Sequence, residues 1–247
     1  MRILVVFRAV TRNWLRSRSG LFFSFLFPVI LLFVFGSIYG GPDAGQIFGQ
    51  NATGYYLPSL TAAFIMTNGV IGLTSVGSEL RRTGVVKRLS VTPLSKLQWL
   101  LGNILSQAVL ALVLATVMLI LGITVYHAAV SINVYSVAML VLGALLFSGV
   151  GMSLAGIVKD PEAASGLGNA IAFPMMLLSG TFWPVSVMPW YLQGASWLLP
   201  LTYFVDGLHS SMTSANPSAA LTDLGVVAIF ACVFIAFGAL ATRWKEE

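Results

Sequence analysis

The sequence predicts an all-α integral membrane protein with six transmembrane helices and both ends in the cytoplasm. Two observations lead to this fold class: long apolar stretches joined by short polar connections, and cationic side chains confined to alternate connections. Mean hydropathy is +0.91, with 57% hydrophobic and 9% charged residues, which leaves too little polar surface to cover a water-soluble protein. No long polar stretch interrupts this pattern, so we expect one membrane domain over residues 1–247.

Six stretches are long enough to cross the hydrocarbon core, which takes about 20 helical residues at about 1.5 Å each. They are residues 21–39, 56–77, 97–125, 134–158, 163–182 and 224–242.

The 13 Lys and Arg residues determine the predicted orientation. They precede the first span, separate the second from the third and the fourth from the fifth, and follow the sixth. The positive-inside rule makes these connections cytoplasmic. Membrane orientation also explains the net charge of +5 better than nucleic-acid binding does, because the basic residues lie at the ends of apolar runs. Amphipathic indoles prefer the membrane interfaces, which agrees with Trp14, Trp99 and Trp244 on the inner side and Trp183, Trp190 and Trp197 on the outer side.

Residues 3–15 predict an amphipathic helix that lies on the inner membrane surface. One face repeats Ile3, Phe7, Val10 and Trp14, and a separate ridge carries Arg8, Arg12 and Arg16. The apolar face would enter the leaflet while the arginines meet lipid phosphates. A plain cationic anchor for the first span is the alternative that the sequence leaves open.

The connection over residues 78–95 predicts a short cytoplasmic helix that is half apolar and half basic. Val85, Val86 and Leu89 can share one helical face, and Pro93 must end the helix. Such an element is suited to a groove on a partner protein, whereas a solvated basic loop is the plainer alternative. The candidate contact residues are Glu79, Arg81, Arg82, Gly84, Val85, Val86, Lys87, Arg88, Leu89 and Pro93.

The outer connection between the fifth and sixth spans is too apolar for a free loop. Pro189 suits the first turn of a helix, and Trp190 and Trp197 face the same way at i and i+7. We therefore expect short helices that re-enter the outer leaflet, with an outer loop held by aromatic anchors as the alternative. The residues singled out here are Gly180, Pro184, Trp190, Trp197, Pro200, Tyr203 and Asp206.

Amides are the most polar groups in the apolar runs, at Asn68, Asn103, Gln107 and Asn169. No Asp, Glu, Lys or Arg lies near a predicted midplane, which argues against proton- or sodium-coupled transport. Asn68 and Asn169 are candidates for a transport pathway, although an interhelical hydrogen bond is the simpler use of a buried amide.

The order of these segments resembles the permease subunits of type 2 ATP-binding-cassette exporters, along essentially the whole chain. The most specific parts are Lys87-Arg88-Leu89 followed by Thr92-Pro93-Leu94-Ser95, and Ser179-Gly180 with Pro184 followed by Leu199-Pro200-Leu201-Thr202-Tyr203 and Asp206. The resemblance implies an elbow helix at residues 3–15, a coupling helix around residues 84–90, and re-entrant helices between residues 181 and 207.

The resemblance also implies the partners and the function. No Gly-x-x-x-x-Gly-Lys-Ser/Thr phosphate loop occurs in the sequence, so we expect two separate ATP-binding subunits to hold ATP and Mg, with no cofactor on this chain. A second permease subunit, identical or similar, would complete the route. The expected function is export of a hydrophobic or amphipathic drug, lipid or lipid-linked glycan across the plasma membrane of a bacterium or archaeon. In this picture, the ATPases push on the face of Val85, Val86 and Leu89.

Two other classes of function were weighed. An intramembrane enzyme would need a catalytic group of residues, but His127 and His209 lie far apart and no His-Glu-x-x-His or Gly-x-Ser-x-Gly motif accompanies them. Asp206 and His209 could share a helical face, for which an ion pair or a helix cap is the simpler explanation. An ATP-independent channel would need a ring-forming polar motif, which the sequence does not show.

Overall fold

The computed structural model describes residues 4, 6–8, 10–12, 18–39, 52–91, 94–158, 160–214 and 216–241. Across these residues the chain forms helices and connecting turns, without a strand. The longer helices are α2 (Arg18–Tyr39), α4 (Ala52–Thr67), α5 (Leu73–Arg82), α7 (Lys96–Tyr126), α8 (Val134–Ile157), α9 (Pro161–Leu178), α11 (Pro200–Thr213) and α12 (Leu221–Ala241). The short elements are α6 (Val85–Ser90), α10 (Trp190–Ser196), a π-helical turn (Asn68–Gly72) and the 3₁₀ turns Val185–Val187 and Pro217–Ala220.

Four helical stretches within the described residues are long and apolar enough to cross a membrane: Thr53–Arg82, Lys96–Tyr126, Val134–Ile157 and Pro217–Ala241. They correspond to the second, third, fourth and sixth predicted spans. The first predicted span falls on α2, whose described apolar stretch is the shorter Phe25–Ser37. The fifth falls on α9, an 18-residue helix that begins with Pro161 and Glu162. The chain is thus a multi-pass membrane protein, while six spans and the orientation of the termini stay predictions.

The helix starts follow from local capping chemistry. Ser95 accepts a hydrogen bond from the Gln98 backbone, and the Gln98 side chain accepts one from the Ser95 N–H, so that two of the amides left without intrahelical partners at the start of α7 are satisfied. Asn133 and Ser136 form the same reciprocal pair at α8. At α9, the Asp160 carboxylate accepts from the N–H groups of Glu162 and Ala163, followed by Pro161 in the first turn.

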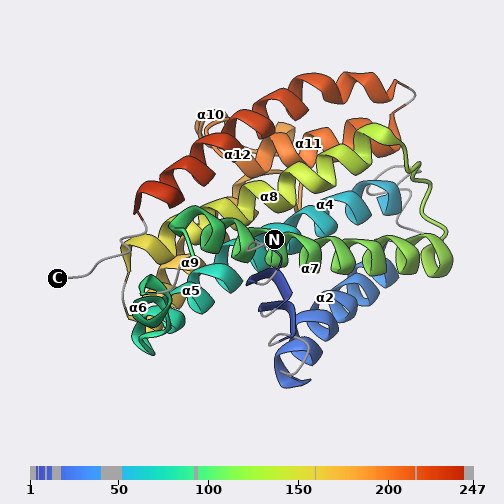
Figure 1. The fold of residues 1–247 in the computed structure, drawn as a ribbon. Helices are drawn as coiled ribbons and strands as arrows, with labels where there is room; N and C mark the ends of the chain where they lie inside the picture. The colour runs from blue at the N-terminus through green and yellow to red at the C-terminus, as the bar shows by residue number, and fades with distance from the viewer. Residues whose placement is uncertain are drawn as a thin grey trace.

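Helix α8 occupies the middle of the bundle (Figure 1), where it packs against α12, α7, α4, α5 and the π-helical turn. Most of its side chains are buried, in contrast to α12, where Ile229, Val233 and Leu240 are exposed. Exposed aliphatic side chains on a helix of this length are those expected to face lipid tails. The core therefore forms around α8, and α12 covers one of its sides.

Small residues let the backbone of α8 touch its neighbours. A Cβ at Gly151 would lie 2.2 Å from the carbonyl oxygen of Gly69 in the π-helical turn, so only glycine fits. The Thr74 hydroxyl donates to the Gly151 carbonyl at 3.1 Å, which ties α5 to α8 at the same place. Lipid tails are as apolar as the helix surfaces, so no hydrophobic force drives the helices together. The helices associate through close backbone contact and interhelical hydrogen bonds.

One sequence-based expectation changes in the structure, and another can be compared over part of its length. Trp99 is only 2% exposed and packs with Leu73, Leu100 and Met152, so its indole belongs to the protein core and not to a lipid-facing surface. In the N-terminal segment, the described residues 4, 6–8 and 10–12 are helical. There Phe7 and Val10 are half-buried while Arg8 and Arg12 are exposed, as an amphipathic helix requires. Trp14 and Arg16 lie outside the described residues.

Replacing Gly151 by alanine should destabilise the protein. The new methyl group would meet backbone atoms that cannot rotate away, so α8 and the π-helical turn must separate, at a cost of about 1–3 kcal/mol. Thermal unfolding of the purified protein in detergent measures this loss. Gly166 is the matched control, because nothing lies within 4 Å of a Cβ there. Gly166→Ala should leave stability equal or raise it by up to about 1 kcal/mol, and equal melting of both variants would contradict the assigned contact.

Candidate functional site

The first candidate region is the α6 corner, formed by the end of α5, helix α6 and the starts of α7 and α9. Gly84 has φ = 71° between α5 and α6, a left-handed conformation that glycine adopts without a Cβ penalty. It lets the chain turn sharply, so that α6 (Val85–Ser90) stands as the short helix predicted from the sequence (Figure 1). The predicted terminator Pro93 lies outside the described residues.

Part of the apolar face of α6 points into the protein itself. Val86 is 5% exposed and belongs to one buried cluster with Leu73, Trp99 and Ile104, and Leu89 packs against that cluster. A short helix gains little stability from its own hydrogen bonds and depends on such packing. Val86 therefore attaches α6 to the bundle, while Val85 and Leu89 are half-buried, and the contact of this face with a partner stays a prediction.

The opposite side of the α6 corner is polar and accessible. Arg88, Thr83 and Val91 are exposed, and Arg82 makes a bidentate ion pair with Glu79, at 3.0 and 3.1 Å. Both members of that pair are solvated, so it contributes little to stability.

Hydrogen bonds from α5 fix the α6 corner to the junction of α8 and α9. The Arg81 guanidinium donates to the Gly156 carbonyl at 2.8 Å, and the Ser78 hydroxyl donates to the Val158 carbonyl at 3.0 Å. Ser75 and Ser165 join their hydroxyls across α5 and α9 at 2.9 Å. Movement of the corner must therefore move the ends of α5, α8 and α9 together.

The second candidate region is a cavity of about 210 Å³ between α2, α4 and α9. Its lining is aromatic and aliphatic, with two polar side chains: Phe27, Leu31, Leu60, Ala63, Phe64, Thr67, Ile71, Asn169, Ala172, Phe173, Met176 and Phe182. The rings of Phe27 and Phe64 meet edge to face, 6.2 Å apart. Apolar walls with a few polar groups are typical of sites for hydrophobic or amphipathic molecules.

Of the two amide residues predicted to line a transport pathway, the structure places only one at the cavity. Asn169 lines the cavity, and its amide donates to the Ser165 carbonyl at 2.8 Å. Asn68 is not part of the cavity lining, and its side chain donates to the Phe64 carbonyl within its own helix. The sequence analysis missed the aromatic lining, because Phe27, Phe64, Phe173 and Phe182 lie on three separate segments and no periodicity connects them.

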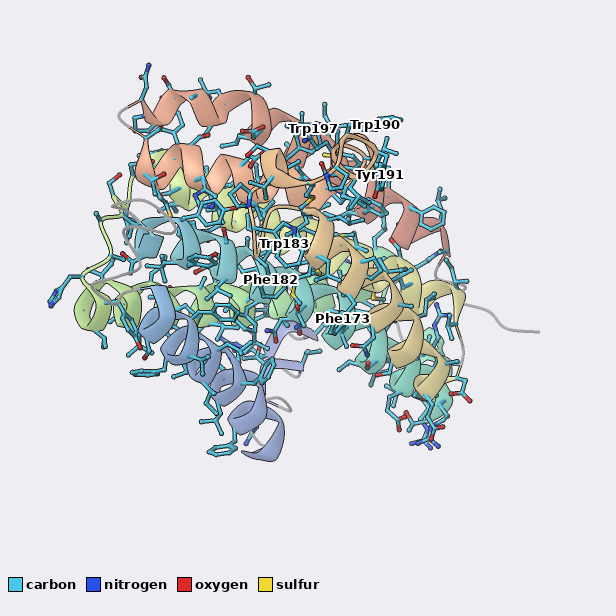
Figure 2. All side chains as sticks on the ribbon, turned by 180° about the vertical axis from the view of Figure 1, so that it is seen from behind. Phe173, Phe182, Trp183, Trp190, Tyr191 and Trp197 are labelled. Atoms are coloured by element: carbon cyan, nitrogen blue, oxygen red, sulfur yellow. The ribbon has the colours of Figure 1, made fainter. Side chains whose placement is uncertain are left out.

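Between α9 and α12 the chain forms the short helices expected there. Pro184 precedes the 3₁₀ turn Val185–Val187, Pro189 caps α10, and Pro200 occupies the first turn of α11. Trp190 is 83% exposed and Trp197 50% exposed. In Figure 2 the labelled side chains follow one another from Phe173 through Phe182 and Trp183 to Tyr191, Trp190 and Trp197 at α10. Tyr203 donates to the Trp197 carbonyl at 2.9 Å.

A polar cluster joins α4, α11 and the turn after α9. The Tyr55 hydroxyl donates to the carbonyl of Gly180, a residue with φ = 79°, at 2.6 Å. The His209 ring stacks on Tyr55 with centroids 4.4 Å apart, and its Nε2 lies 2.8 Å from the Ser59 hydroxyl. The expected pairing of His209 with Asp206 is therefore replaced by a bond to Ser59.

The pKa values of Asp206 and His209 are shifted in opposite directions. Burial, with a contribution from the charge of Asp223, raises the pKa of Asp206 to about 6. Burial lowers the pKa of His209 to about 4. Both shifts favour the neutral form, as expected for groups removed from water. Among the described residues no group of three or more His, Cys, Asp or Glu side chains could hold a metal ion.

Comparison with known proteins identifies the family. The family model described as "ABC-2 type transporter" matches residues 1–213. One relative is the "Probable multidrug ABC transporter permease YbhR" of Escherichia coli K12, 31% identical over 155 residues, or 62% of this chain and 42% of that protein. Another is the "Inner membrane transport permease YadH" of the same strain, 24% identical over 84% of this chain and 82% of that protein. The "Linearmycin resistance permease protein LnrN" of Bacillus subtilis is 26% identical over 73% of this chain and 47% of that protein.

The chain belongs to the ABC-2 type transporter family. The match with YbhR spans less than half of that protein's length.

The carboxyl group of Asp206 should make the stability of the protein depend on pH. Because its pKa is raised to about 6, the folded protein holds this proton more tightly than the unfolded chain, and the stabilisation is lost as pH rises from about 4 through 6. We expect the melting temperature of the wild type to fall relative to that of Asp206→Asn between pH 5 and pH 8, measured by tryptophan fluorescence. His209 titrates identically in both proteins, so its effect cancels. Parallel curves would disprove the buried carboxyl.

Proposed function

We propose that this chain is the membrane-spanning permease subunit of an ATP-driven exporter that moves a hydrophobic or amphipathic molecule out of the cell. The observation that carries the proposal is that the helical stretch Thr53–Arg82 holds the apolar cavity along one half and the α6 corner at its end. One continuous element thus connects the surface where a partner can push with the place where a molecule can bind.

The energy source would be a separate protein. Because the sequence holds no phosphate loop, ATP and Mg would bind to two separate ABC ATPase subunits. These subunits would dock at the α6 corner. In our proposal that corner and both termini face the cytoplasm of a bacterial or archaeal cell, consistent with the placement of the basic residues. The basic side that carries Arg82 and Arg88 would contact the ATPase, while Val86 and Leu89 hold α6 rigidly, so that force reaches α5 without being absorbed.

The size and the lining of the cavity are arguments for a second permease subunit and for an apolar cargo. Its volume of about 210 Å³ is below the roughly 300–1,000 Å³ of sites for drug-sized ligands, so one copy provides only part of a chamber. Phe27 and Phe173 at its edge are 58% and 60% exposed, a further sign of an incomplete wall. A second copy of this chain, or a similar permease, would complete it. The printed names of YbhR and LnrN favour a drug-like cargo.

Reversing the charge of Arg88 should separate partner binding from folding. Arg88 is exposed, so we expect Arg88→Glu to fold like the wild type but to lose co-purification with the ATPase and ATP-dependent transport about tenfold or more. The control is Thr222→Glu, which adds a negative charge at an exposed position at the start of α12, away from the α6 corner, and should keep both activities. Val86→Ala should instead lower thermal stability, by about 1–3 kcal/mol. Full transport by Arg88→Glu would reject the assigned ATPase contact.

Filling the cavity should block transport without unfolding the protein. Ala172 is 3% exposed and lines the cavity, so a phenylalanine there would occupy the space meant for cargo. We expect Ala172→Phe to reduce ATP-dependent uptake of ethidium into inverted vesicles while membrane insertion persists. Ile229→Phe, on the exposed side of α12, is the matched control and should behave like the wild type. Equal transport by both variants would show that cargo takes another route.

A further inference from the structure

The helix that joins the cavity to the α6 corner is interrupted at one point. Residues Asn68–Gly72 form a π-helical turn between α4 and α5, in which the backbone takes in one extra residue. Such turns are rare, and they often lie at functional positions. Here the turn separates Thr67, which lines the cavity, from Ser78 and Arg81, which anchor the corner.

A side chain from another helix supports this turn. The Gln107 amide on α7 donates to the Asn68 carbonyl oxygen at 2.7 Å. The same amide nitrogen would lie 3.0 Å from a Cβ placed at Gly72, so glycine at that position leaves room for it. In a membrane interior, a carbonyl freed by irregular backbone needs a donor from a neighbouring helix. Gln107 supplies that donor, and it is 3% exposed.

The turn is enclosed on its other sides. Gly69 lies directly against Gly151 of α8, and the Cα of Ile71 is 3.3 Å from a Cβ placed at Gly168 of α9. The side chain of Ile71 also lines the cavity. The turn therefore touches α7, α8 and α9 while it borders the space proposed for cargo.

We propose that the turn Asn68–Gly72 is a joint that converts movement of the α6 corner into rotation of α4, and that Gln107 is the residue that positions it. An α-helix has 3.6 residues per turn, so each residue advances it by about 100°. If the extra residue of the π-helical turn were taken up into regular α-helix, the two halves would rotate relative to each other by about this angle. A switch from π to α geometry would therefore turn different faces of α4 toward the cavity. The inference rests on the proposed function, because it assigns the mechanical link within the same transport cycle.

Gln107→Leu tests the joint, since leucine keeps most of the volume and removes the donor. Asn103→Leu is the matched control: Asn103 lies one turn earlier on α7, is 1% exposed, and donates only to the Trp99 carbonyl of its own helix among the described bonds. Both variants are reconstituted with the co-purifying ATPase in vesicles. We expect Gln107→Leu to transport about three- to tenfold less ethidium per ATP hydrolysed, as loss of one buried hydrogen bond would produce, while Asn103→Leu keeps the wild-type ratio.

Spin labels test the same joint without a cargo. One label is placed on Cys232 of α12, the single cysteine of the chain, and a second on Thr53→Cys at the start of α4 or on Thr83→Cys at the corner. Trapping ATP on the complex should change both distances in the wild type. In Gln107→Leu, only the distance to position 83 should change.

The outcomes separate the two proposals. If the wild-type complex hydrolyses ATP without any ATP-dependent transport of ethidium or of a fluorescent phosphatidylcholine, the export function is overturned. If the wild type transports but Gln107→Leu matches it in transport per ATP and in both distances, the joint is overturned and export stands. An equal loss in Asn103→Leu also overturns the joint, because it shows that any buried amide of α7 is needed for packing alone.

Discussion

The contact between α8 and the π-helical turn is the constraint on which the rest of the structure depends. Gly151 lets the carbonyl of Gly69 approach where no side chain would fit, and Thr74 adds a hydrogen bond to the Gly151 carbonyl at the same level. Helices in lipid gain little from burying apolar surface, so close backbone packing and hydrogen bonds decide which helices associate. This contact places α4 and α5 on one side of α8, and α12 closes another.

Polar side chains inside the bundle donate hydrogen bonds to backbone carbonyls. Gln107 bonds to the Asn68 carbonyl, Ser153 to the carbonyls of Gly149 and Phe234, and Ser78 to the Val158 carbonyl. Each bond satisfies a carbonyl that lipid could not solvate. A permease can therefore be nearly free of charge within its apolar helices and still hold a defined arrangement. Such an arrangement suits movement driven from outside the membrane better than movement driven by titrating groups.

Two regions at different levels of the bundle share the helical stretch Thr53–Arg82. At one end, the α6 corner is attached by a buried apolar cluster and by Arg81 and Ser78. At the other, Tyr55 and Ser59 bind α11 and the turn after α9. The cavity lies between them, beside the one interruption in that stretch. The π-helical turn is the place where this stretch departs from regular α-helix, which is a physical reason to place the moving part there.

The sequence alone determined the all-helical class, the four long apolar stretches and the family. Long apolar runs, Ser95-x-x-Gln98 and Asn133-x-x-Ser136 caps, and Pro161 after Asp160 are local signals, because a bilayer and a helix terminus impose their demands on neighbouring residues. Only the tertiary structure decided which face of α6 is free, that Trp99 is buried, that His209 bonds Ser59, and that four phenylalanines from three segments enclose a cavity. Those outcomes depend on contacts between residues far apart in the chain. The partner of Gln107 was equally hidden, since a buried amide signals that a partner exists but does not identify it.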